Sequence, residues 1–148
     1  MKIEIVELKE MEFVEVEGEF KQVFKNQKRV PCFITNFAIK KGKELGLING
    51  SLISDLFKLQ NSVKENGEVS SDAIDSLDET ELQKVIYLGY VGANPNTELT
   101  FDEFIQKFHY SYEETVLLYV NLIEKTISNN PNLFAEGFKK STKSEKKQ

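Results

Sequence analysis

The chain has 148 residues, of which 40% are hydrophobic and 29% charged, with three Pro and eight Gly. This composition excludes collagen-like, disordered and disulfide-scaffold classes, and the length predicts one compact domain with its own core. The net charge is −5, but five lysines and one glutamate fall within 139–148, so the rest of the chain carries 14 basic and 23 acidic side chains, a net charge of −9 that argues against binding to nucleic acid.

Cysteine content and hydropathy indicate the compartment. Cys32 is the only cysteine, so no internal disulfide can form, and no apolar stretch reaches the ~18 residues of a membrane span. Residues 1–8 alternate charged and apolar side chains, unlike a signal peptide. We therefore expect a cytoplasmic protein without membrane contact.

The start of the chain has the pattern of antiparallel strands. Apolar side chains alternate with glutamates in 3–8 and 13–17, as in strands with one buried and one wet face. Gly18 predicts a hairpin turn. A polar break at 25–28 makes a small three-stranded sheet an alternative to the hairpin. Pro31 is expected to end this region because proline cannot donate to a sheet hydrogen bond.

Helical periodicity begins after the strands. Apolar residues recur every three or four positions, and turn or capping residues separate the segments. The helices predicted by this pattern cover 33–45, 52–66, 79–92, 101–109, 112–128 and 132–140. Three of them begin with a capping box, in which a side-chain oxygen at the cap is followed three residues later by glutamate. These boxes are Asp78 with Glu81, Thr100 with Glu103, and Ser111 with Glu114.

Together these elements predict an α+β fold that is mainly α. A small N-terminal antiparallel β hairpin or sheet (1–31) precedes a helical bundle (33–140) in a single domain, 1–140. The basic tail, 141–148, contains no apolar residue to bury and is expected to be disordered.

The segment 92–103, GANPNTELTFDE, has oxygen-bearing side chains at several positions of an EF-hand loop. Gly92 stands at the first ligand position, where aspartate is needed, and Thr97 stands where the loop needs glycine. The capping box formed by Thr100 and Glu103 accounts for the oxygen-bearing side chains at the end of this segment. We therefore expect no calcium site, no other metal and no cofactor.

The chain also lacks a recognisable catalytic constellation. His109 is the only histidine and is expected to end a helix, where its charge suits the helix dipole. Cys32 is interpreted as a small buried apolar group, and the carboxylates in 72–81 as stabilising first helical turns. Since no nucleotide-binding loop is present either, we expect no enzyme activity.

The segment 112–128 has a wider apolar face than one packing surface requires. Its apolar stripe spans roughly 200° of a helical wheel, against the ~100° of a surface helix. Two explanations stay open: a central helix packed on two sides, or a helix with a face for another chain. On the second explanation, the partner surface would expose Leu117, Leu118, Leu122, Phe134 and Phe138, and substitutions at Leu118 and Leu122 would leave the protomer folded.

The segments FITNFAIKKGKELGLINGSLISDLFKLQ (33–60) and VIYLGYVGANPNTELTFDEFIQKFHYSYEETVLLYVNLIEKTIS (85–128) resemble tail assembly chaperones of long-tailed, siphovirus-type bacteriophages of Gram-positive hosts. The resemblance implies a protein of the host cytoplasm, absent from the mature virion, that binds the hydrophobic tape measure protein until the tail tube assembles. It also implies a homo-oligomer, contact with the tail tube protein, and a longer form made by ribosomal frameshifting, with which the terminal Lys146-Lys147 is compatible.

A function of a different class also remains open. An acidic protein of this size can act as a regulator, either as a degenerate calcium sensor or as a nucleic-acid mimic that inhibits a DNA-binding enzyme. Partners captured from infected cells distinguish the two: a tape measure protein supports the chaperone, and a nuclease supports the mimic.

Overall fold

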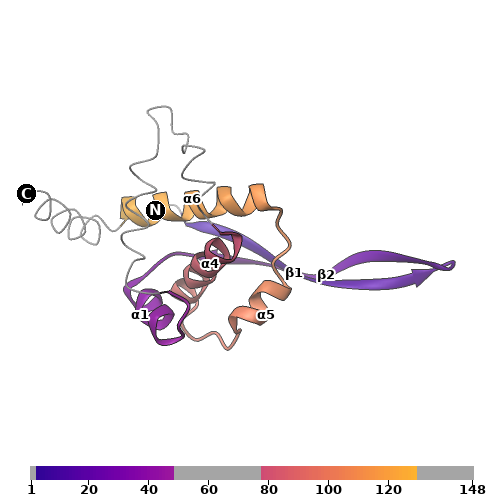
Figure 1. The fold of residues 1–148 in the computed structure, drawn as a ribbon, viewed down its shortest axis with the longest axis horizontal. Helices are drawn as coiled ribbons and strands as arrows, with labels where there is room; N and C mark the ends of the chain where they lie inside the picture. The colour runs from indigo at the N-terminus through magenta and orange to yellow at the C-terminus, as the bar shows by residue number, and fades with distance from the viewer. Residues whose placement is uncertain (1–2, 49–77, 130–148) are drawn as a thin grey trace, which may run out of the picture.

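The computed structural model describes residues 3–48 and 78–129 and confirms the α+β class (Figure 1). An antiparallel hairpin comes first, and helices follow it. The predicted helices at 52–66 and 132–140 and the basic tail at 141–148 lie outside the described residues.

The hairpin pairs β1 (Glu4–Val16) with β2 (Glu19–Cys32). Glu17 and Gly18 connect the strands with φ values of 54° and 80°. Positive φ at both central residues defines a type I′ turn, whose twist matches that of the flanking strands. The turn predicted at Gly18 is therefore confirmed.

The polar segment 25–28 bends β2 without ending it, so the three-stranded alternative is wrong. The register shifts between Leu8 and Glu10 of β1, which leaves β2 with one extra residue, a β-bulge. Asn26 adopts a φ of 54° there, a conformation that asparagine tolerates well. The strand also continues through Pro31, which a two-stranded sheet permits because each strand has a free edge.

Four helices follow in the described part of the chain. They are α1 (Asn36–Glu44), α4 (Glu79–Ala93), α5 (Phe101–Gln106) and α6 (Tyr112–Asn129). The capping boxes at Thr100 and Ser111 are formed in both directions, as predicted. The carboxylate of Asp78 also caps its helix, but Glu81 pairs with Lys84 at 3.3 Å instead.

The prediction that His109 ends a helix is wrong. α5 ends earlier, and the backbone N–H of Lys107 closes its last turn on the Phe104 carbonyl oxygen at 3.0 Å. His109 lies in the connection to α6. The rings of Phe108 and Tyr110 pack against each other in this connection, 5.0 Å apart, and the buried Phe108 anchors it to the core.

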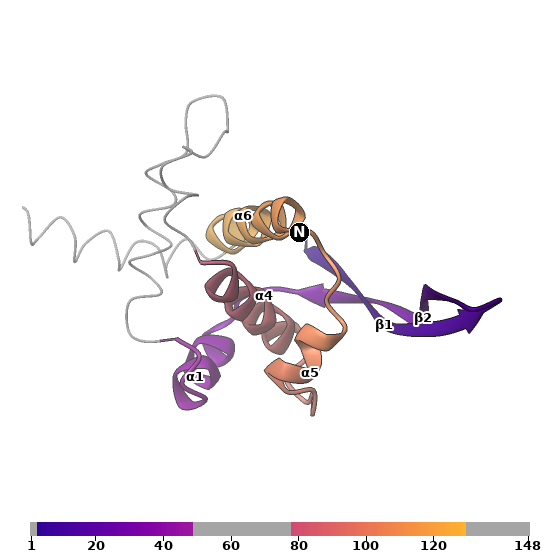
Figure 2. The ribbon, with the colours of Figure 1, turned by 45° about the vertical axis from the view of Figure 1, so that its right-hand side comes forward.

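Helix α4 is the centre of the fold, and α1, α6 and β2 pack around it (Figures 1 and 2). Its residues 85–91 are buried on all sides, as predicted from their uninterrupted apolar sequence. The backbone of α4 is approached closely: the Phe33 N–H donates to the Gly89 carbonyl oxygen at 2.9 Å, and a Cβ at Gly92 would overlap the Phe33 carbonyl oxygen. Small residues thus let the chain leaving β2 lie against the helix.

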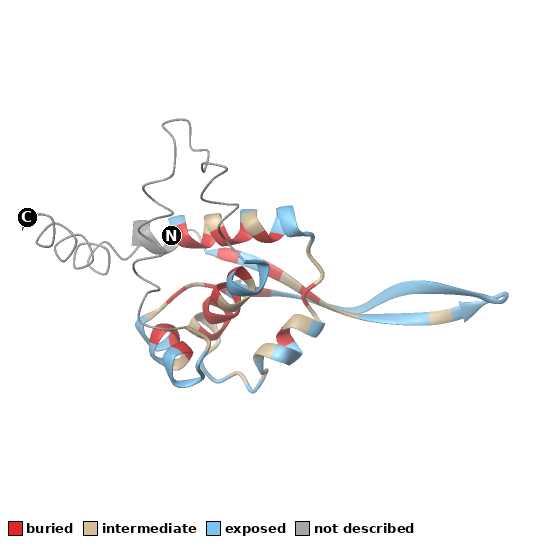
Figure 3. Ribbon diagram, viewed as in Figure 1, coloured by how far each residue is buried: buried red, intermediate tan, exposed pale blue. Residues whose placement is uncertain are grey.

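Only the base of the hairpin belongs to the core. Val6, Leu8, Val30 and Cys32 are buried there, and the carboxylate of Glu4 accepts from the Lys125 ammonium at 2.6 Å, joining β1 to α6. Figure 3 shows buried residues where the helices meet this base, whereas the distal half of the hairpin is almost entirely exposed. We call this distal half, residues 10–25, the arm.

Candidate protein-binding surface

The arm projects from a base that is fixed along the outer edge of β1. The Glu7 N–H donates to the Tyr110 hydroxyl at 2.9 Å, and the Lys9 N–H donates to the Lys107 carbonyl oxygen at 3.0 Å. These bonds satisfy the edge of β1 up to the bulge. Because no such bonds continue past it among the described residues, the arm leaves the body at this point.

The strand register assigns every arm residue to one of two faces. Cross-strand partners share a face, and successive residues alternate between faces. Met11 pairs with Phe24, Phe13 with Gln22, and Glu15 with Phe20. We call the side chains of Met11, Phe13, Phe20 and Phe24 the aromatic face. Val14, Val16 and Val23 lie on the opposite face, which we call the valine face.

The aromatic face is open to solvent. Met11 and Phe24 are each 40% exposed, Phe13 is 61% exposed and Phe20 is 72% exposed. With about 200 Å² on each such side chain, these fractions amount to roughly 400 Å² of apolar surface. A contiguous patch of this size is comparable to the largest apolar patch of a typical monomer, and such patches are often interaction sites.

Few polar groups interrupt the aromatic face. The Gln22 amide contacts the Met11 sulfur at 2.7 Å, and the Lys9 ammonium lies over the Phe24 ring, 4.1 Å from its centroid. Phe24 also contacts the His109 ring at 5.4 Å between centroids. Cation–π and ring contacts therefore hold the end of this face that is nearest the body.

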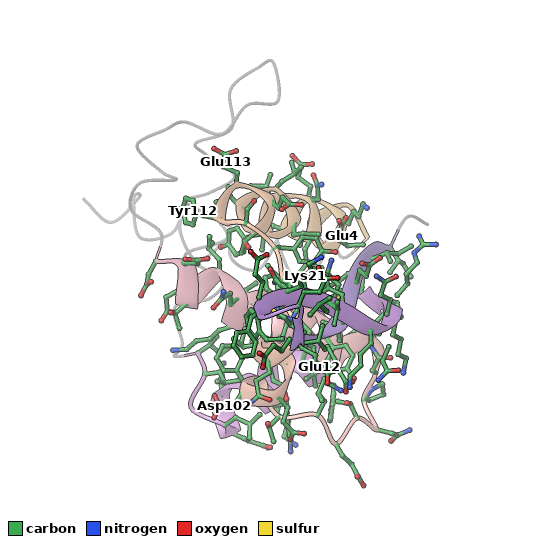
Figure 4. All side chains as sticks on the ribbon, turned by 90° about the vertical axis from the view of Figure 1, so that its right-hand side faces the viewer. Glu4, Glu12, Lys21, Asp102, Tyr112 and Glu113 are labelled. Atoms are coloured by element: carbon green, nitrogen blue, oxygen red, sulfur yellow. The ribbon has the colours of Figure 1, made fainter. Side chains whose placement is uncertain are left out.

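The valine face is much more charged. The register places five charged side chains on the same face as the valines: Glu10, Glu12, Glu19, Lys21 and Lys25. Figure 4 views the arm from its tip and labels two of them, Glu12 and Lys21. Lys25 pairs with Glu12 at 3.0 Å, and the hydrogen bond to this carboxylate raises the pKa of the Lys25 ammonium. This face is suited to water, which leaves the aromatic face as the binding candidate.

An open hollow of about 730 Å³ lies between the arm and α5. It is lined by Glu10, Met11, Glu12, Lys25, Ile105, Gln106, Lys107 and His109. The Nε2 atom of His109 is buried there without a hydrogen-bond partner, and Lys107 lies 4.0 Å from the Glu10 carboxylate. Six of the eight lining residues have polar or charged side chains, but none of them forms a pair of nucleophile and base.

Two of the five residues predicted for a partner surface on the helices are buried, so the prediction is wrong for these two. Leu117 is exposed, at 61%, but Leu118 and Leu122 are core residues with 8% and 1% exposed. α6 packs on both α4 and β1, and the Leu122 side chain meets the backbone of α4 at Gly89, so the wide stripe belongs to a helix packed on two sides. The remaining predicted residues, Phe134 and Phe138, lie outside the described residues.

Sequence reasoning missed the aromatic face, although a signal for it is present. Both strands beside the turn carry large apolar groups on both faces, with Phe13 between Glu12 and Val14 and Phe20 between Glu19 and Lys21. A half-buried strand should be apolar on one face only. The mixed pattern thus indicates a hairpin that the body does not cover.

The groups suspected of chemistry have structural roles. Burial raises the pKa of the Cys32 thiol to about 12, with a further contribution from nearby Glu4, so this cysteine is not a nucleophile. In the EF-hand-like segment, the Thr97 hydroxyl meets the Tyr90 hydroxyl at 2.8 Å, and the Leu99 carbonyl accepts from Tyr87 at 2.7 Å. The segment packs its polar groups against α4.

Over residues 3–48 and 78–129, no group of three His, Cys, Asp or Glu side chains is placed to hold a metal ion. Among the described helices, none combines the length and the apolar character needed to cross a bilayer. None of the known protein-family models, curated proteins or solved structures matches this chain.

Proposed function

We propose that this chain is a tail assembly chaperone that binds the hydrophobic tape measure protein of a long-tailed bacteriophage in the host cytoplasm. The observation that carries the proposal is the aromatic face of the arm, where an acidic protein holds four large apolar side chains in solvent. Such a surface is typical of binding to another protein. The sequence resemblance of 33–60 and 85–128 supplies the identity of the client.

The shape of the arm suits a helical client. From Met11 to Val16 the arm is about 20 Å long, at ~3.4 Å per residue. A strip of this length with apolar groups on one face complements three to four turns of an amphipathic helix. A tape measure protein rich in long apolar helices would offer many such segments.

One arm alone would bind the client with modest affinity. Burying roughly 400 Å² on the arm and as much on the client contributes about 20 kcal/mol. The cost of association, about 4–15 kcal/mol or more, and the ordering of side chains oppose most of it. Stable coverage therefore requires several copies along one client, and the net charge of −5 on each copy would keep the assembly soluble.

The test is co-expression with the tape measure protein, scoring the soluble fraction of that client. The client should be soluble only in the presence of the wild-type chain. The double variant Phe13→Glu/Phe20→Glu should lose this effect, and the matched control Val14→Glu/Val16→Glu should retain it, because its changes fall on the valine face.

The outcomes separate the function from the site. A client that stays insoluble with the wild-type chain contradicts the function. If the two double variants perform equally, the function stands but the aromatic face is not its site. Capture of a nuclease in place of the tape measure protein would favour the acidic regulator.

A further inference from the structure

The arm lacks the support that a stable hairpin needs. A two-stranded hairpin is marginally stable in water, and it usually requires a third strand or a helix against its apolar face. Nothing among the described residues covers the aromatic face between Phe13 and Phe20. A surface of this kind needs a partner whenever the protein is folded, and a second copy of the chain is the one partner that is always present.

The charges along the arm are arranged with opposite signs at its two ends. Glu15, Glu17 and Glu19 surround the tip, and all three are exposed. Lys9 lies over Phe24 at the base, with its ammonium 3.8 Å from the Glu7 carboxylate, and Lys28 and Arg29 are exposed beyond it. An arm with an acidic tip and a basic base is complementary to a second arm that runs in the opposite direction.

The register places the apolar groups to match the same arrangement. The apolar groups of the aromatic face run from the Met11–Phe24 pair to the Glu15–Phe20 pair, so the paired residues Phe13 and Gln22 mark its middle. Lys9 and Glu17 lie four residues to either side of Phe13. A two-fold axis through this level therefore brings Phe24 onto the second copy's Phe20 and Glu17 to the second copy's Lys9.

We propose that two copies of this chain pair through the aromatic faces of their arms, antiparallel about a two-fold axis at the level of Phe13 and Gln22. The pairing is isologous, so each arm covers the other. Roughly 400 Å² of apolar surface from each arm, with its polar rim, gives an interface near the ~1,200 Å² lower limit of specific complexes. The dimer is therefore expected to dissociate in the micromolar range.

The pairing has a consequence that rests on the proposed function. If the client binds the aromatic face, the arms of the free protein mask each other, and client binding competes with self-association. The exposed apolar surface would then be hidden until a client arrives, which limits non-specific aggregation.

The first experiment is sedimentation velocity on the purified full-length chain without any client. The wild type should form a concentration-dependent dimer. Phe13→Glu/Phe20→Glu should weaken the dimer at least tenfold, whereas Val14→Glu/Val16→Glu should leave its dissociation constant within about twofold. A wild type that is monomeric at high concentration, or an aromatic-face variant that dimerises normally, would overturn the proposal.

A charge exchange tests the antiparallel register without removing apolar groups. Glu17→Lys and Lys9→Glu should each weaken self-association, because either variant places like charges at both ends of the interface. An equimolar mixture of the two should restore dimerisation as a heterodimer. If the mixture dimerises no better than its components, the antiparallel arrangement is wrong.

These measurements do not involve the client, so they can fail independently of the proposed function. A dimer that does not rescue the tape measure protein would refute only the chaperone activity. A monomeric chain that does rescue it would refute only the pairing of arms.

Discussion

Cys32 lies at the end of β2 with no exposed surface, and burial raises the pKa of its thiol from 9.0 to about 12. A thiol with a raised pKa in the folded state stabilises the fold fully below the unfolded pKa and loses that contribution as the pH rises towards the folded pKa. The contribution of the Cys32 thiol to the free energy of unfolding therefore begins to fall at about pH 9.

We predict that Cys32→Ala flattens the alkaline part of the stability curve. Above about pH 9 the wild type should lose up to about 1.4 kcal/mol of unfolding free energy per pH unit more than the variant does. Below that pH the difference between the two proteins should be constant. Urea unfolding across this range measures both slopes, and parallel curves throughout would contradict the burial of the thiol.

Gly92 is a second residue whose role depends on a close backbone contact. A Cβ at this position would overlap the Phe33 carbonyl oxygen, which belongs to the main chain and cannot rotate away. We predict that Gly92→Ala lowers the free energy of unfolding by about 2 kcal/mol or more.

Gly46 provides the comparison because a Cβ there would meet no atom within 4 Å, although its φ is +72°. Gly46→Ala should cost only the conformational strain of a left-handed residue, about 1 kcal/mol. The two variants can be compared by chemical denaturation. A smaller loss at Gly92 than at Gly46 would mean that α4 does not lie this close to the chain leaving β2.

At the scale of elements, the helix starts could be predicted from sequence because their signals are local. Thr100 and Ser111 each meet a glutamate three residues on, and both boxes are formed. The orientation of α6 could not be predicted from local signals of this kind. Leu117 and Leu118 are adjacent apolar residues of one helix, and only the positions of α4 and β1 decide which of them is buried.

The two halves of the hairpin illustrate the same limit. The segments 3–8 and 13–17 both alternate apolar and acidic residues, yet the first packs on the helices and the second projects into solvent. Strand propensity reflects how well a residue fits a half-buried sheet. It does not say whether another part of the protein packs on that sheet. The aromatic face was missed for this reason.

The burial of α6 leads to a prediction that corrects the expected tolerance of its leucines. Leu122→Ala should lower the free energy of unfolding by about 2–5 kcal/mol, because it removes a side chain that is 1% exposed against Gly89. Leu117→Ala, on the exposed side of the same helix, should change it by less than about 0.5 kcal/mol. Thermal and urea unfolding test the pair, and equal losses would place Leu117 in a contact that the fold does not show.

At the scale of the whole molecule, the fold separates into a body with a core and an arm without one. None of residues 10–25 belongs to the buried cluster. We predict that replacing 13–22 with an Asn-Gly turn, which joins the paired Glu12 and Val23, leaves cooperative unfolding intact and changes the melting temperature by no more than a few degrees.

The same shortened protein should neither dimerise nor keep the tape measure protein soluble, because Phe13 and Phe20 are removed from the aromatic face. Calorimetry reports the first effect, and sedimentation with co-expression reports the second. Loss of cooperative unfolding would show that the arm supports the body, which the burial of its residues does not predict.

In the proposed function, the client is held on the aromatic face of the arm. The most direct measurement is photo-crosslinking in cells that co-express the tape measure protein, with benzoylphenylalanine placed at Phe13 or at its neighbour Val14, whose side chain lies on the opposite face. We predict adducts with the tape measure protein from position 13 and few or none from position 14. Adducts from position 14 alone, or equally weak adducts from both positions, would contradict the claim.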